Sequence, residues 1–83
     1  MLSKGLQVRV ISREGVEYEG KCEGISSINP TGEFDVLEDH ANFITPVTHE
    51  VTVYIGSKRR KVFKLKKGLV MIKDNVASVF VGI

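Results

Sequence analysis

The sequence contains few of the features that mark secreted, disulfide-linked or membrane-spanning proteins. It has one cysteine in 83 residues, Cys22, which cannot form an internal disulfide and therefore favours a reducing compartment. Its longest apolar run is four residues, whereas a bilayer-spanning helix needs about 18. Residues 1–7 lack the charged and then apolar pattern of a secretory signal. We expect one soluble domain over residues 1–83.

Residues that could support catalysis or bind a metal are also scarce. The glycines are scattered singly, so there is no glycine-rich phosphate loop. Cys22, His40 and His49 are too few and too irregularly spaced for a structural zinc site. A Cys22–His40 nucleophile pair is one alternative, and a small cupin-like barrel enzyme is another. Because Cys22 alternates with Glu23 we expect it in the core, and we predict no enzyme activity, no cofactor and no metal.

The hydropathy pattern is that of strands and turns, with almost no helical periodicity. Leu6, Val8 and Val10 alternate with polar neighbours, as in a half-buried strand. Residues 29–32 (Asn-Pro-Thr-Gly) are the clearest turn, and residues 74–75 (Asp-Asn) suit a type I′ hairpin turn. Asp39 is expected to cap a brief helical turn over residues 40–42. Strands are expected at residues 6–11, 16–28 (interrupted at the glycines 20 and 24), 33–37, 43–47, 51–55, 61–65, 69–73 and 76–81.

These elements predict an all-β fold. Short strands at this spacing, without a ten-residue helix, are typical of a two-sheet antiparallel β-sandwich of about eight to ten short strands, with a small barrel as the alternative. Pro46 lacks an N–H and is expected on an edge or at a strand end.

Charge is distributed unevenly along the chain. Residues 1–57 hold four basic and nine acidic residues, whereas residues 58–83 hold eight basic residues and one acid. The two halves can attract each other, or each can face its own partner. Residues 58–67 alone carry seven cations, which suits either a nucleic-acid patch or a solvated hairpin. Phe63 and Leu65 share one strand face and are expected in the core, which leaves no exposed aromatic ring among the cations and favours the hairpin.

Three segments resemble the epsilon subunit of F-type ATP synthases, in the order and at the spacing of its N-terminal β-sandwich domain. They are Gly15-Val-Glu-Tyr-Glu-Gly20, then Gly32-Glu-Phe-Asp-Val-Leu-Glu-Asp-His-Ala-Asn-Phe-Ile-Thr45, then Lys67-Gly-Leu-Val-Met-Ile-Lys-Asp-Asn75. The most specific matches are Gly32-Glu33-Phe34 and His40-Ala41. Three positions depart from the family's pattern: Asn42 replaces a proline, residues 47–50 replace a Pro-Gly turn, and Lys67 replaces the first glycine of a Gly-Gly pair.

The resemblance implies a non-catalytic rotor subunit of a proton-translocating synthase, which links the gamma subunit to the c-ring and couples ion flow to ATP synthesis. It implies a location on the cytoplasmic face of the cell membrane, as one copy within the complex and without direct lipid insertion. The family's ring-facing loops include the positions of Glu33 and His40, which we expect to converge at one end of the sandwich. The family's inhibitory, sometimes ATP-binding, C-terminal helical hairpin has no counterpart before Ile83, so we expect a naturally short or a truncated form that does not bind ATP. The alternative function is a free-standing β-barrel module that binds nucleic acid through residues 58–67.

Overall fold

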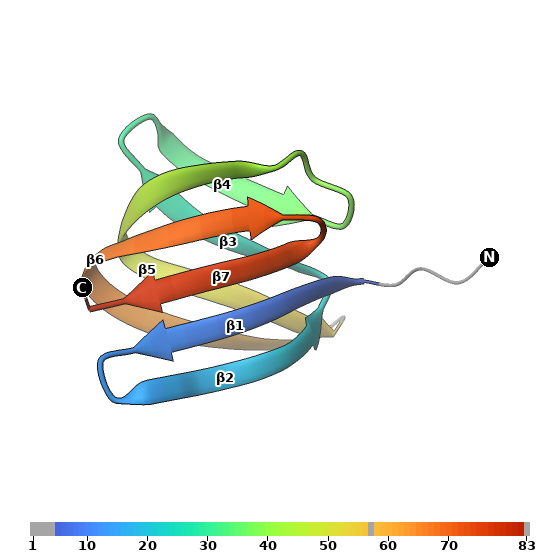
Figure 1. Ribbon diagram of the computed structural model, residues 1–83, viewed down its shortest axis with the longest axis horizontal. Helices are drawn as coiled ribbons and strands as arrows, with labels where there is room; N and C mark the ends of the chain where they lie inside the picture. The colour runs from blue at the N-terminus through green and yellow to red at the C-terminus, as the bar shows by residue number, and fades with distance from the viewer. Residues whose placement is uncertain (1–4, 57, 83) are drawn as a thin grey trace.

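The computed structural model describes residues 5–56 and 58–82, which form seven strands arranged as two layers (Figure 1). Among these residues there is no helix long and apolar enough to cross a bilayer. The strands are β1 (Leu6–Ser12), β2 (Gly15–Cys22), β3 (Gly24–Asn29), β4 (Gly32–Leu37), β5 (Phe43–Gly56), β6 (Arg59–Lys73) and β7 (Val76–Val81).

The seven strands belong to one sheet, in the order β2-β1-β7-β6-β5-β3-β4. Strands β1 and β7 run parallel, and the other described neighbours are antiparallel. The long hairpin of β5 and β6 bends so that it contributes to both layers (Figure 1). The first layer holds β2, β1, β7, the second half of β6 and the first half of β5. The second layer holds the first half of β6, the second half of β5, β3 and β4.

The predicted all-β sandwich is confirmed, but the strands are fewer and longer than expected, and one pair is parallel. Breaks were expected near residues 47–50 and 66–68, where the structure has a bulge instead. At the bulge His49 has φ 72°, the left-handed conformation that a glycine would adopt most easily, and the Thr48 hydroxyl donates to the Lys66 carbonyl at 2.8 Å. The bulge bends the β5–β6 hairpin but ends neither strand. The four strands expected at residues 43–47, 51–55, 61–65 and 69–73 are therefore the two strands β5 and β6.

The interior between the layers is built from small and branched apolar side chains. As expected, Leu6, Val8 and Val10 are fully buried and Cys22 is buried, while Phe63 and Leu65 pack against the core. Among the described strands, residues 43–47 of β5 pair with β6 alone, so the expected edge position of Pro46 is confirmed. The buried apolar cluster consists of Leu6, Val8, Val10, Cys22, Ile25, Val36, Val47, Val51, Val53, Val70, Ile72, Ala77 and Val79.

Gly68 lies just after the bulge, where β6 begins to pair with β7. A Cβ atom at this position would collide with the Phe80 carbonyl oxygen and with the side chain of Leu65. The glycine therefore lets the β7 backbone approach β6 closely at the bend.

Candidate functional site

Asn75 organises one end of the sandwich. Asp74 and Asn75 have φ 49° and 66°, so both central residues of this hairpin turn have the positive φ that the predicted type I′ turn requires. The Asn75 side chain accepts a hydrogen bond from the Asp39 N–H at 2.7 Å and donates one to the Gly5 carbonyl at 3.2 Å. A second hydrogen bond joins the same two loops in the opposite sense, because the Asn42 side-chain oxygen accepts from the Asp74 N–H at 2.9 Å. Strand connections that are distant in sequence are thereby held together.

The same hydrogen bonds replace the expected helical turn over residues 40–42. Asp39 has φ 65°, which is left-handed, and donates its N–H to Asn75 instead of capping a helix. His40 is exposed, its Nδ1 lies 2.8 Å from the Ala41 carbonyl oxygen, and its ring centroid lies 4.9 Å from that of Phe43. The imidazole is therefore positioned by neighbours at the surface, as a contact residue would be.

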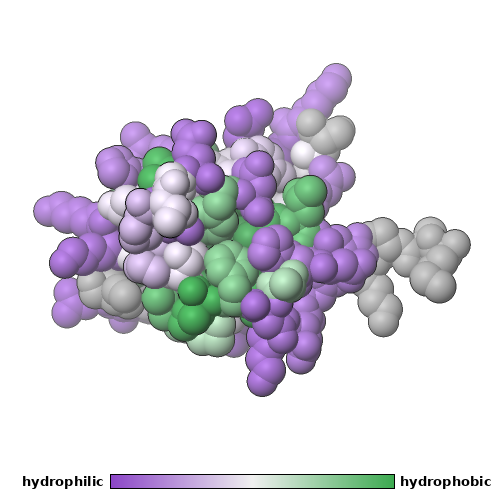
Figure 2. Space-filling model, turned by 90° about the horizontal axis from the view of Figure 1, so that it is seen from above, coloured by the Kyte–Doolittle hydropathy of each residue, from purple (hydrophilic) through white to green (hydrophobic). Residues whose placement is uncertain are grey.

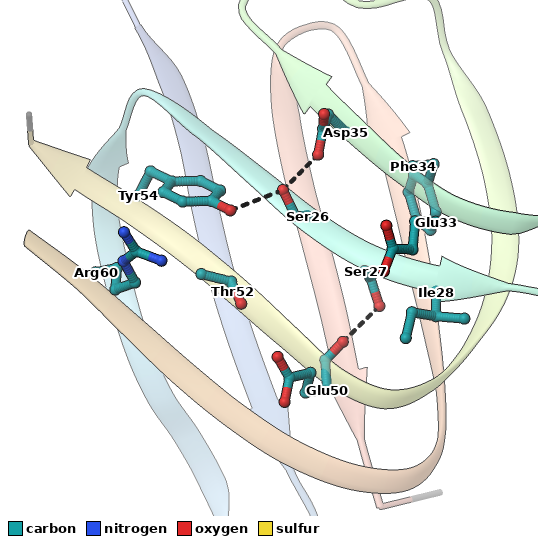
Figure 3. Close-up of a pocket in the computed structure, with 10 residues that line it drawn as sticks. All are labelled: Ser26, Ser27, Ile28, Glu33, Phe34, Asp35, Glu50, Thr52, Tyr54 and Arg60. Carbon is teal, nitrogen blue, oxygen red and sulfur yellow. Dashed lines mark hydrogen bonds between the residues drawn. The ribbon is translucent and has the colours of Figure 1, made fainter.

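Glu33 is also exposed, but it lies near the start of β4. It borders a shallow polar depression of about 290 Å³ on the outer face of the second layer (Figure 3). There the Ser26 hydroxyl donates to the Asp35 carboxylate at 2.5 Å and lies 3.1 Å from the Tyr54 hydroxyl. These polar side chains already satisfy one another.

The structure does not bring Glu33 and His40 together in one loop cluster. Glu33 follows the β3–β4 turn, whereas His40 follows the far end of β4. Glu33 lies near the start of β4 and His40 lies in the loop after its end, so the two residues mark opposite ends of this edge strand. Their convergence on one surface and their role as partner contacts stay predictions.

An apolar row crosses the outer face of the first layer. Its members stand directly opposite one another on successive strands, point away from the core and span about 19 Å at the usual strand spacing. Beside the row lie Ile44 and Met71, which face each other across β5 and β6 and are 59% and 37% exposed. The row consists of Pro46, Leu69, Phe80, Ile11 and Val16. We call these seven residues the apolar face.

One end of the apolar face opens into a hollow. Pro46 and Leu69 belong to the row and also line a hollow of about 460 Å³, together with Pro30, Val47 and the lysines 66 and 67. Figure 2 views the molecule from above and therefore shows the edge formed by the strands at the top of Figure 1, with the outer face of the first layer edge-on; hydrophobic surface gathers along this edge among hydrophilic side chains. An apolar patch with a polar rim is typical of a protein–protein contact.

The apolar face was missed in the sequence analysis, although a signal was present. Residues 69–72 (Leu-Val-Met-Ile) are apolar without alternation, and residues 79–81 (Val-Phe-Val) repeat this on the neighbouring strand. A strand that is apolar on both faces is typical of one covered on both sides. Val70, Ile72 and Val79 fill the core, so their neighbours in sequence lie on the outer face of the layer.

The basic stretch of residues 58–67 lies on the first part of β6 and the turn before it. Among residues 5–56 and 58–82 the ion pair is Arg9–Glu19, at 3.3 Å, and no cation of the basic stretch has a carboxylate partner. Arg60 lies over the Tyr54 ring at 5.6 Å and Lys61 over the Tyr18 ring at 5.7 Å. The described residues therefore contain no ion pair between the acidic and the basic half of the chain. The Tyr18 and Tyr54 rings are covered by cations, so they are not open for base stacking.

Cys22 and His40 do not form a nucleophile pair, because Cys22 is in the core and His40 is at the surface. Burial raises the pKa of the Cys22 thiol above its ordinary value of 9.0, so the reactive thiolate is disfavoured. Within the described ranges, no three His, Cys, Asp or Glu side chains are grouped so that they could hold a metal ion.

The fold and its surfaces define an all-β sandwich domain with an exposed apolar face. Over residues 5–82 the chain matches the family described as ATP synthase, Delta/Epsilon chain, beta-sandwich domain. The chain belongs to this family, as its sequence motifs indicated.

Solved structures of low sequence identity have the same fold. One is a chain of the Tetrahymena thermophila mitochondrial ATP synthase central stalk and c-ring, with 9% identity and a TM-score of 0.81, over 100% of this chain and 67% of that one. Another is a chain of the Euglena gracilis mitochondrial ATP synthase, OSCP/F1/c-ring, with 12% identity and a TM-score of 0.85, over 98% of this chain and 52% of that one. The chain therefore spans about half the length of the Euglena chain.

Proposed function

We propose that this chain is a non-catalytic central-stalk subunit of a proton-translocating F-type ATP synthase. The match to the delta/epsilon β-sandwich family over residues 5–82 carries this proposal. The likeness to chains from two central-stalk and c-ring assemblies supports it at the level of the fold. In this role the domain links the gamma subunit to the c-ring, so that ion flow and ATP synthesis are coupled through one rigid rotor.

The apolar face suits the gamma subunit as its partner. A permanent contact is more apolar than the average surface, and seven neighbouring apolar side chains beside a hollow provide such a contact. The Arg9–Glu19 pair lies beside the face and supplies part of a polar rim that fixes register.

The edge at β4 suits the c-ring. Glu33 lies on this edge strand and His40 in the loop after it, and the exposed Leu37 lies between them in sequence. A carboxylate and an imidazole at two separate points define an orientation better than one loop cluster does. In the assembled complex the domain lies at the cytoplasmic face of the cell membrane, held there by protein contacts and not by lipid insertion.

The proposal is tested by tagging the chain in its own cells and isolating it in mild detergent after nuclease treatment. We expect gamma and c subunits, identified by mass spectrometry, to be recovered in fixed proportion to the tagged chain. Recovery of the chain without synthase subunits would contradict the proposal. Loss of a bound partner on nuclease treatment would support a nucleic-acid module instead.

A further inference from the structure

The first part of β6 has a free edge. Strand β7 pairs with residues 68–73 of β6, and β5 pairs with β6 along nearly its whole length. Residues 59–65 therefore have a described neighbour strand on one side only. Because N–H and C=O groups alternate in direction along a strand, every second residue here directs its backbone groups away from β5.

Cations lie on both faces of this edge. Lys61 is opposite the buried Val53 and reaches across to the Tyr18 ring of β2, so it lies on the inner side. Arg60 lies over Tyr54 and borders the outer polar depression, and Lys64 alternates with the inward Leu65, so both lie on the outer side. The edge thus carries cations above and below its backbone groups, and on the outer side Lys64 has Glu50 as its cross-strand neighbour without forming an ion pair with it.

We propose that residues 59–65 of β6 bind an extended acidic peptide segment of a partner protein, which adds to the sheet as an extra strand. Backbone hydrogen bonds along the free edge would supply affinity. Carboxylates alternating to the two faces of the added strand would lie directly opposite Lys61 on one side and Arg60 and Lys64 on the other, at the spacing of cross-strand pairs.

The charge of an incoming strand decides whether it can pair with this edge of β6. A second copy of this chain would bring the same cations against this edge, so pairing of two β6 edges is opposed by repulsion. An acidic strand gains attraction from cations that have no carboxylate partner in the described part of the chain. The edge is therefore protected from self-association and remains open to an acidic segment.

Nucleic acid fits the same charges less well. Single strands bind by stacking bases on open aromatic rings beside a cationic groove. Here Phe63 packs against the core, and the Tyr18 and Tyr54 rings are covered by Lys61 and Arg60. Cations that alternate between the two faces of a strand also match a strand better than they match a continuous phosphate backbone.

The test uses a peptide of about eight residues in which pairs of adjacent glutamates alternate with threonine–valine pairs, so that carboxylates reach both faces of the added strand. Strands of this length are typical. Its matched control has the same charge but a central proline, which cannot join a ladder. A single-stranded oligonucleotide of equal charge is the third probe. Binding is measured by calorimetry with the full chain at about 50 mM and about 300 mM salt.

We expect saturable binding of the alternating peptide, at least tenfold weaker binding of the proline peptide, and weakening of both at high salt. Amide exchange at residues 59–65 should slow when the alternating peptide is bound. R60E with K64E should weaken binding at least tenfold, whereas K21E with K73E, which changes one exposed cation on β2 and one at the far end of β6, should weaken it less than threefold. Circular dichroism checks that each variant is folded.

Three results would overturn the proposal. Equal binding of the two peptides would mean that charge alone attracts them. Tighter binding of the oligonucleotide than of the alternating peptide would assign the surface to nucleic acid. Absence of peptide binding at low salt would mean that the cations only prevent this edge from pairing with other strands. The proposal does not depend on the stalk assignment, so the co-isolation experiment can succeed or fail independently of it.

Discussion

The Asn75 side chain binds the backbone of Asp39, which lies 36 residues earlier in the sequence, through a hydrogen bond of 2.7 Å. Its amide group also binds Gly5, and its own backbone carbonyl accepts from the Gln7 N–H at 3.0 Å. One residue thus ties the β6–β7 turn to the N-terminal strand and to the loop that carries His40.

Replacing Asn75 should therefore destabilise the domain in two separable ways. N75G keeps the freedom for φ 66° and loses both side-chain hydrogen bonds, which should lower the unfolding free energy by about 1–2 kcal/mol. N75A loses the same bonds and adds about 1 kcal/mol for the left-handed conformation. Urea unfolding measures both variants, and equal stability of N75A and wild type would refute the role of this residue.

Gly68 should tolerate no side chain. G68A forces a Cβ atom against the Phe80 carbonyl oxygen and Leu65, so β7 must move away from β6 at the bend. We expect a loss of about 2–4 kcal/mol, typical of overpacking next to rigid backbone. G82A is the matched control, because a Cβ there meets nothing within 4 Å, although its φ of 76° adds a small strain. A G68A protein that unfolds at the same urea concentration as G82A would contradict this account of the bend.

The thiol of Cys22 should make stability fall at alkaline pH. Burial raises its pKa above 9.0, so the unfolded chain releases the proton near pH 9 while the folded chain still holds it. Stability from this group is complete below pH 9 and declines as pH rises above 9, by at most about 1.4 kcal/mol per pH unit. C22A should show a smaller decline between pH 8 and pH 10 in urea unfolding. An identical decline in both proteins would assign it to other groups.

The elements that sequence could predict are those set by local residue chemistry. Alternation identified β1, and the Asp74-Asn75 pair identified the β6–β7 turn because both residues tolerate positive φ. The union of four expected strands into β5 and β6 was not predictable, because it depends on His49 accepting φ 72° under tertiary constraint. The apolar face was equally hidden, because an outward Leu69 and an inward Val70 look alike until the strand order is known.

Glu33 and His40 lie apart, so their substitutions should act independently. E33R and H40E change exposed side chains and should each alter the unfolding free energy by less than about 1 kcal/mol. In the assembled complex each should weaken retention on the c-ring, and the double variant should uncouple ATP hydrolysis from proton pumping. The effects on ring retention should multiply, because residues without shared partners behave additively in free energy.

Retention is measured by the amount of c-ring recovered with the tagged chain, and coupling by proton pumping in membrane vesicles at a fixed hydrolysis rate. A double variant that assembles and pumps like the wild type would remove both residues from the ring contact. Matching losses in gamma binding would instead place them at the other interface.

The most direct test of the stalk assignment is to measure by calorimetry the binding of the purified chain to the gamma subunit of the same synthase. The variant I44E with M71E places two carboxylates on the apolar face, and L37E with V62E places two on the other layer at residues of comparable exposure. We expect a one-to-one complex that I44E with M71E weakens at least tenfold and L37E with V62E weakens less than threefold, with all proteins folded. Gamma binding that is absent, or that is unchanged by I44E with M71E, would contradict this account.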